Sequence, residues 1–195
     1  MYTSLINYIN RETGSTLKED EIELIKKHFS LLKIKKRHFF LQQGEVCKYS
    51  GFIVKGSMKQ YSTDDKGIEH IVHLYIENWW PSDRESFITN TPSIYNIDAL
   101  EDTNLLVVSR EGAAELNKIP VIAELTRIMD EKNAFAYKKR INSAISMTAE
   151  QRYLMLLKNY PDFLQRFPQH MIASYLGIKK ETLSRIRSQM FKNKD

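Results

Sequence analysis

The sequence predicts an α+β protein that consists of a β-roll of the jelly-roll type with an N-terminal helix, one long helix, and a C-terminal helix-turn-helix domain. Three observations predict it. Short apolar runs separated by glycines fill residues 34–109. A stretch free of glycine and proline then extends from Val121 to Tyr160, and "ASYLGIKKETLSRIRSQM" follows at residues 173–190. The first pattern is typical of short strands and the other two are typical of helices.

The composition excludes several kinds of protein. The chain has 195 residues, a formal net charge of +5 and a single cysteine, Cys47. One cysteine cannot form an intramolecular disulfide, and an iron–sulfur cluster needs about four thiolates, so we expect no cluster. No apolar run reaches about 18 residues and the start lacks a signal-peptide pattern, so we expect a cytoplasmic protein without membrane contact.

The first helix is predicted from about Leu17 to Leu32. Thr16 is a suitable N-cap, and Glu19 three residues later completes a capping box. Apolar residues of this segment recur at helical spacing, which predicts an amphipathic helix packed on the rest of the protein.

The β region is predicted from its turns. Gly44, Gly56 and Gly67 recur at intervals of roughly a dozen residues, as in a series of short strands. "DDKG" at residues 64–67 is a good hairpin turn, and "YNIDALEDTNLLVVS" supplies two more strands around Glu101 and Asp102. Many short strands with few helices predict a sandwich, jelly roll or barrel.

The long helix is predicted to begin near Pro120, a residue that suits the first helical turn. From Val121 to Ser146 it would span about 40 Å. Its apolar stripe either packs along its own domain or pairs with a second copy of the chain. We favour self-pairing, because a small β domain offers too little surface for so long a stripe.

The remaining residues predict three helices. The first is capped by Thr148 and ends at Pro161, the second runs from Pro168 to Gly177, and the third follows directly. The expected domains are therefore an effector-sensing β-roll with the N-terminal helix at 1–118, a dimerisation helix at 119–147, and a helix-turn-helix domain at 148–195.

The stretch after Pro168 has the spacing of a helix-turn-helix. Two helices that cross steeply need a small residue at their contact, and Ala173 supplies it. The turn needs a residue that tolerates positive φ, and Gly177 supplies that. The wedge between the helices needs apolar residues, which are Ile172, Leu176, Ile178, Leu183 and Ile186.

The other face of the second helix, residues 179–191, carries groups that can read DNA. Arg185 can bond a guanine bidentately, Glu181 can accept from a cytosine amino group, and Lys180 is also placed to read bases. The residues expected to contact phosphates are Gln169, Lys179, Thr182, Ser188 and Lys192. The alternative is a solvated charged helix, but the combined spacing of Ala173, Gly177, Ile178, Leu183 and Ile186 is more specific than charge alone.

This order of elements resembles the Crp/Fnr superfamily of bacterial transcription regulators. The most specific part is "YLGIKKETLSRI", which resembles the family's recognition motif at Lys180, Glu181 and Arg185. The resemblance implies a homodimer, a cyclic-nucleotide-binding-like effector domain, and recognition helices in successive major grooves about 34–36 Å apart. The expected partners are double-stranded operator DNA, a second copy of the chain, RNA polymerase and an unidentified small-molecule effector.

The sequence departs from the family pattern in places. Lys180 stands where arginine is usual, and Lys179 replaces the usual serine or threonine cap. The segment before Pro168 is too short for the strand pair often found there, and no wing is evident after Met190. Tyr95 and Asn96 replace the Arg-Ser pair that holds a cyclic phosphate, so cyclic AMP is not the expected effector.

A pocket for another effector could be lined by Trp80, Arg84, Tyr95 and Asn96, although core packing also explains a tryptophan at this place. No cofactor and no metal is expected. His70 and His73 are three apart on a strand and point to opposite faces, so they cannot share one metal that way.

We therefore expect a DNA-binding regulator and no enzyme. The alternatives are a β-roll binding module whose helical tail contacts proteins, and a small barrel enzyme that retains metal.

Overall fold

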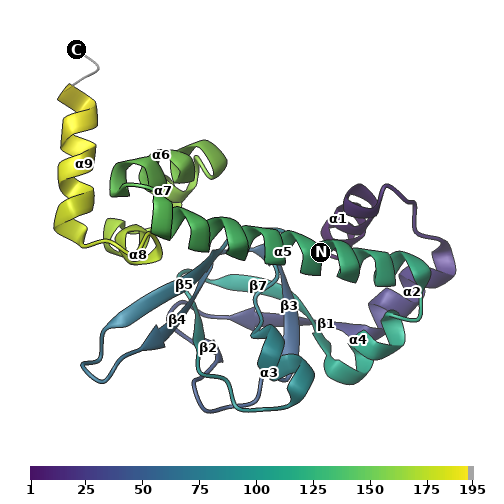
Figure 1. Cartoon of the computed structure of the whole chain (residues 1–195). Helices are drawn as coiled ribbons and strands as arrows, with labels where there is room; N and C mark the ends of the chain where they lie inside the picture. Colours follow the sequence, from purple (N-terminus) through teal and green to yellow (C-terminus); the bar gives the residue numbers. More distant parts are fainter. Residues whose placement is uncertain (193–195) are drawn as a thin grey trace.

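The computed structural model describes residues 1–192. In Figure 1 a β-roll lies beneath the long helix α5, Pro120–Ser146, with α1 and α2 near one end of this helix and α6–α9 near the other. The α+β architecture predicted from the sequence is confirmed, with a β-roll, a long helix and C-terminal helices in that order. None of the helices within residues 1–192 has the length and apolar character needed to cross a membrane.

The N-terminal region holds two helices, and only part of one was predicted. Helix α1, Tyr2–Thr13, buries Leu5 and Ile9 and ends at Gly14, whose φ is 67°. Helix α2, Glu19–His28, begins later than expected, because Glu21 caps it by accepting a hydrogen bond from the Lys18 N–H at 2.8 Å. The prediction of Thr16 as the N-cap and of a helix to Leu32 is therefore wrong.

Two antiparallel sheets form the β-roll. The three-stranded sheet has the order β1-β7-β3 and the four-stranded sheet has the order β2-β6-β4-β5. The strands are β1 Phe29–Ile34, β2 Phe39–Leu41, β3 Tyr49–Lys55, β4 Met58–Thr63, β5 Glu69–Tyr75, β6 Asn96–Ala99 and β7 Thr103–Ser109. β1 takes the residues predicted to end the first helix, since Phe29 pairs with Val108 and Ile34 with Thr103 of β7.

The predicted turns of the β-roll are present. Between β4 and β5 the Gly67 N–H donates to the Asp64 carbonyl oxygen at 2.9 Å, and Gly67 has a φ of 77°. The Asp64 side chain also accepts from the Ile68 N–H at 2.9 Å. The charged pair at residues 101 and 102 joins β6 to β7 as predicted.

Two apolar clusters fill the β-roll. One packs the three-stranded sheet against α1 and α5 through Ile9, Phe52, Leu106 and Leu125. The other lies between the sheets around Ile53 and includes residues of both. Two short helices complete the unit, α3 at Arg84–Thr89 and α4 at Arg110–Leu116.

Helix α5 is partly buried along its first half and mostly exposed along its second half. Its first half packs on its own domain, where Ile122 and Leu125 are buried and α1 lies alongside, with an ion pair between Lys132 and Glu12. The second half is mostly exposed and carries apolar side chains: Phe135 is 61% exposed, Ile141 62% and Ile145 81%.

The C-terminal helices are α6 Ala149–Asn159, α7 Phe163–Arg166, α8 Gln169–Tyr175 and α9 Lys180–Lys192. Thr148 caps α6 as predicted, since its hydroxyl accepts from the Gln151 N–H at 3.2 Å while the Gln151 side chain accepts from the Thr148 N–H at 2.9 Å. The prediction of three helices omitted α7. This helical turn occupies the segment before Pro168 that was predicted to be too short for a strand pair.

Candidate nucleic-acid interface

The turn between α8 and α9 is closed by backbone hydrogen bonds. The Ile178 N–H donates to the Ala173 carbonyl at 3.0 Å, and the Gly177 N–H donates to the Ser174 carbonyl at 2.9 Å. This is the Schellman pattern, which requires a left-handed residue after the helix. Gly177 has that conformation, with a φ of 65°.

The helices that meet at this turn share an apolar core. Ala173 is buried at the crossing, and Ile172 and Leu183 are completely buried. Leu176 and Ile178 are half-buried and pack on the same core. Ile186 of α9 is buried as well, and the core is completed by residues of α6 and α7 and the residue after α7, namely Tyr153, Leu156, Phe163 and Phe167. With one face of α9 held inward in this way, its opposite face is turned to solvent.

The exposed face of α9 brings the three predicted base-reading residues together. Lys180, Glu181 and Arg185 are all exposed and share one face of α9. Ser184, Ser188 and Gln189 lie on the same face. Gln189 was not singled out from the sequence, although it lies four residues after Arg185 and therefore on the same helix face. In Figure 1 this helix lies at the outer edge of the molecule.

The predicted phosphate-contacting residues surround this face unevenly. Gln169 at the start of α8, Lys179 before α9, and Ser188 are exposed, whereas Thr182 is half-buried. Lys192 ends α9, and its side chain lies outside the described part of the chain. The lysines and Arg185 give this surface a cationic character that suits a polyanion.

The four residues predicted to line an effector pocket each contact other parts of the protein and not one another. The ring of Trp80 packs 5.2 Å from that of Phe52 and 6.1 Å from that of Tyr8 of α1, so this residue joins the core. Arg84 is paired with Asp130 of α5 at 2.7 Å.

Tyr95 is half-buried, and its N–H donates to the Ser93 hydroxyl at 3.0 Å. The side chain of Asn96 accepts from the Gln43 N–H at 3.0 Å. Within residues 1–192, no hydrogen bond or ring contact joins Trp80, Arg84, Tyr95 and Asn96 to one another.

Comparison with known proteins identifies the domain and the fold. Residues 31–118 match the family model of the cyclic nucleotide-binding domain. No curated protein sequence matches the chain significantly.

Several solved structures match over most of the chain. FixK2 from Bradyrhizobium japonicum matches with a TM-score of 0.71 and 18% identity, over 85% of each chain. The catabolite activator protein from Thermus thermophilus matches with a TM-score of 0.55 and 19% identity, over 93% of this chain and 87% of that one.

The global regulator CLP from Xanthomonas campestris, described as responsive to c-di-GMP, matches with a TM-score of 0.66 and 13% identity, over 90% of this chain and 93% of that one. These likenesses cover the β-roll, the long helix and the C-terminal helices together. Residues 31–118 are therefore similar to a cyclic nucleotide-binding domain, and the chain as a whole shares the fold of these three proteins.

Proposed function

We propose that this protein is a homodimeric, sequence-specific DNA-binding transcription regulator of the Crp/Fnr type. The observation that carries the proposal is the exposed face of α9, where Lys180, Glu181 and Arg185 stand side by side over a buried helix-turn-helix core. Residues 1–118 are assigned to effector sensing, 119–147 to dimerisation and 148–195 to DNA binding.

Each residue of this face has a role set by its chemistry. Arg185 offers a planar fork for a guanine, and Glu181 accepts from a cytosine amino group. Lys180 carries a point charge without the fork of arginine, so its contribution to base choice is less directional. Gln169, Lys179, Thr182, Ser188 and Lys192 are assigned to the phosphates, where they set the register of the helix on the duplex.

The dimer is proposed to form along the second half of α5. Phe135, Ile141 and Ile145 are exposed there, and burial of such side chains against a second copy would remove them from water. A two-fold dimer would place its two α9 helices in successive major grooves about 34–36 Å apart.

The effector is proposed to be something other than cyclic AMP. The two positions aligned with the phosphate-binding pair are the uncharged Tyr95 and Asn96, and the guanidinium of Arg84 is engaged by Asp130. Arg84 is the only cation among the four predicted pocket residues. A cyclic phosphate would therefore have to displace the Asp130 carboxylate from Arg84 in order to bind it.

The test is selection of duplexes from a random DNA library at two salt concentrations. The wild-type protein should select a near-palindrome, and its affinity should fall steeply with salt. Arg185→Ala should relax base preference at one position of each half-site and cost about 1–3 kcal/mol on the preferred base. Lys179→Ala should weaken all sequences about equally.

A wild-type protein that selects no duplex even in dilute buffer would refute this function. It would favour the second candidate, a β-roll binding module whose C-terminal helices contact another protein.

A further inference from the structure

The C-terminal helices do not extend freely from α5 but pack on the four-stranded sheet. One apolar cluster contains Ile71 and Leu74 of β5 together with Phe163 and Ile172 of the helix-turn-helix unit. Trp79, which follows β5, places its ring 5.5 Å from that of Tyr160 and 6.0 Å from that of Phe163. The two units therefore share buried apolar surface.

Helix α8 also covers the free edge of the sheet. β5 is an edge strand, and such strands carry unpaired backbone groups that need partners. The Ser174 hydroxyl accepts from the Ile71 N–H at 2.9 Å and donates to the Glu69 carbonyl at 3.2 Å. Arg140 of α5 donates to the carbonyls of Ile71 at 3.2 Å and Tyr175 at 3.1 Å, and so ties β5, α5 and α8 together.

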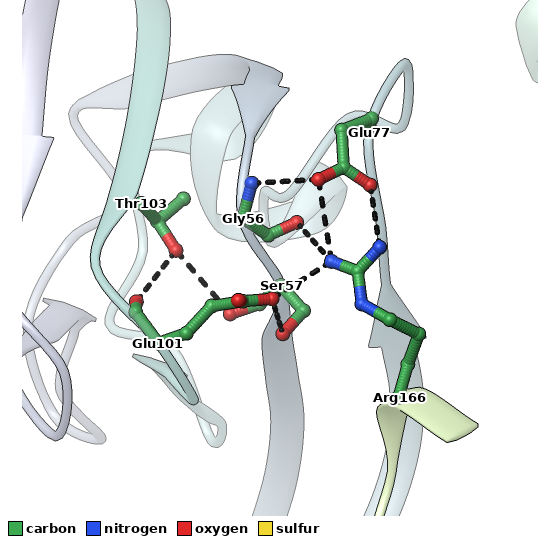
Figure 2. A network of polar contacts seen from close by, with 6 residues as sticks. All are labelled: Gly56, Ser57, Glu77, Glu101, Thr103 and Arg166. Atoms are coloured by element: carbon green, nitrogen blue, oxygen red, sulfur yellow. Dashed lines mark hydrogen bonds and ion pairs between the residues drawn. The ribbon is translucent and has the colours of Figure 1, made fainter. Parts of the chain in front are cut away.

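A third contact joins α7 to the loops at the end of the β-roll. Figure 2 shows the guanidinium of Arg166 between two carboxylates. Its Nη1 lies 2.9 Å from the Glu77 Oε2, and its Nη2 lies 2.7 Å from the Glu101 Oε1. Nη2 also donates to the Gly56 carbonyl at 3.3 Å. We call Arg166, Glu77 and Glu101 the latch.

The β-roll holds both carboxylates of the latch in place. The Gly56 N–H donates to Glu77 at 2.9 Å, and the Ser57 hydroxyl donates to Glu101 at 2.7 Å. Burial alone would raise the pKa of Glu77, but the hydrogen bonds from Arg166 and Gly56 outweigh it, so this pKa lies below its usual value. The hydrogen bonds from Ser57 and Arg166 likewise lower the pKa of Glu101. The acceptor site is thus built by one unit and its cation is supplied by the other.

The short linker between α5 and α6 does not by itself fix the orientation of the helix-turn-helix unit, so the packing and polar contacts described above must do so. Only Met147 and Thr148 separate α5 from α6, and Met147 is extended with φ −112° and ψ 146°. Rotation about these two residues would swing the whole helix-turn-helix unit, so packing on β5 and the latch must fix its direction. The reading face of α9 stays exposed in this arrangement, so the docked unit is open to DNA.

We propose that Arg166 is a positioning residue for DNA recognition. By latching α7 to Glu77 and Glu101 it fixes the direction of α9 relative to α5, and so fixes the half-site spacing that a dimer accepts. This inference rests on the proposed function. It predicts a change in spacing preference without a change in the bases read, because Arg166 lies on α7, outside the reading face.

The experiment compares the wild-type protein with Arg166→Gln on duplexes in which the selected half-sites are moved apart or together by two base pairs. The wild-type protein should discriminate at least about tenfold between the selected spacing and the altered ones, and Arg166→Gln should discriminate less than about threefold. Hydrogen exchange without DNA gives a second readout, since the Ile71 amide bonded to Ser174 should exchange faster in the variant.

Lys118→Gln is the control. Lys118 pairs with Glu115 at 2.8 Å, and the pair lies at the end of α4 and just after it, outside the segments assigned to dimerisation and DNA binding. It should leave the spacing preference and the Ile71 exchange at wild-type values. Glu101→Gln weakens the latch from the β-roll side, so it should act like Arg166→Gln and add little to it. This variant keeps the test valid if Arg166→Gln folds poorly.

Wild-type spacing discrimination together with wild-type exchange in both latch variants would overturn the proposal. Tighter binding of Arg166→Gln at every spacing would also overturn it, because the latch would then oppose DNA binding. A wild-type protein that selects no duplex would refute the proposed function instead, while the exchange measurement would still decide whether the latch holds the units together.

Discussion

His73 lies where the β-roll, α5 and the C-terminal helices meet. Its ring stacks on Tyr75 at 4.8 Å and meets the edges of Trp79 and Tyr137, while its Nδ1 has no hydrogen-bond partner within the described residues. Burial, with a smaller effect of the Arg140 charge, lowers the pKa of His73 to about 4. The folded protein therefore binds this proton less readily than the unfolded chain does, and stability is lost as the pH falls from about 6.5 towards 4.

The pKa shift of Asp98 has the opposite effect on the pH dependence of stability. Burial raises the pKa of its carboxyl to about 6, although Lys59, 3.7 Å away, partly offsets this effect. Between about pH 4 and 6 the folded state therefore binds the Asp98 proton more readily than the unfolded chain, and stability falls as the pH rises. The contributions of His73 and Asp98 overlap in this range and partly cancel.

Asp98→Asn should uncover the contribution of His73. We expect the free energy of unfolding of this variant to fall by up to about 3 kcal/mol between pH 6.5 and pH 4, more steeply than in the wild-type protein. Urea unfolding at a series of pH values would measure it. His73→Phe is the complementary variant, and its free energy of unfolding should fall less over this range than that of the wild-type protein. Equal slopes in all three proteins would show that neither group titrates in this way.

At the scale of elements, two glycines close turns with positive φ for different reasons. Gly177 has a φ of 65°, and an added Cβ would meet nothing within 4 Å. Gly56 has a φ of 115°, and an added Cβ would lie 2.4 Å from the Thr103 Oγ1 and 2.8 Å from its Cα. Gly177 is required only for its backbone conformation. Gly56 is also required because the segment that holds Thr103 packs directly against it.

Alanine at these positions should therefore differ in cost. Gly177→Ala should destabilise the protein by about 1–2 kcal/mol, the strain of a left-handed residue. Gly56→Ala should cost more than about 3 kcal/mol, because overpacking adds to the strain. Urea unfolding of both variants is the measurement, and equal costs would mean that the β-roll relaxes around Gly56.

Elements with local signals could be predicted from the sequence. Pro120 and the lack of later breakers marked α5, "DDKG" marked the β4–β5 hairpin, and the pair Ala173 and Gly177 marked the turn between α8 and α9. β1 could not be predicted in this way, since Phe29 follows α2 without a break and its strand state comes from pairing with Val108, far away in the chain.

The same distinction between local and long-range signals applies to the candidate site. The reading face of α9 follows from helical spacing within one segment, so Lys180, Glu181 and Arg185 could be placed on one face from the sequence. The latch could not, because Arg166 lies 89 residues from Glu77 and 65 from Glu101. No pattern within a window of the sequence joins residues so far apart.

At the scale of the whole molecule, α5 has a different neighbour along each half. Its first half is covered by α1 and the three-stranded sheet, and Arg140 in its second half reaches the edge of β5 and α8. The side chains of Phe135, Ile141 and Ile145 remain without cover in the described monomer. Isolated exposed apolar residues are ordinary, but Ile141 and Ile145 lie one turn apart on α5 and, with Phe135 on the same helix, form the surface proposed above for dimerisation.

Ile145→Glu should separate the proposed dimer without unfolding its subunits, because the side chain is 81% exposed in the monomer and a charge costs little there. Burial of that charge between two copies of α5 should weaken dimerisation at least about 30-fold, as loss of a central interface residue does. Sedimentation equilibrium would measure the change.

Ile88→Glu on α3, where the native side chain is 56% exposed, is the control and should leave the dimer intact. Ile145→Glu should also lose affinity for a duplex with two half-sites while its weak binding to a single half-site is unchanged. If Ile145→Glu dimerised as tightly as Ile88→Glu, the subunit contact would lie elsewhere on the molecule.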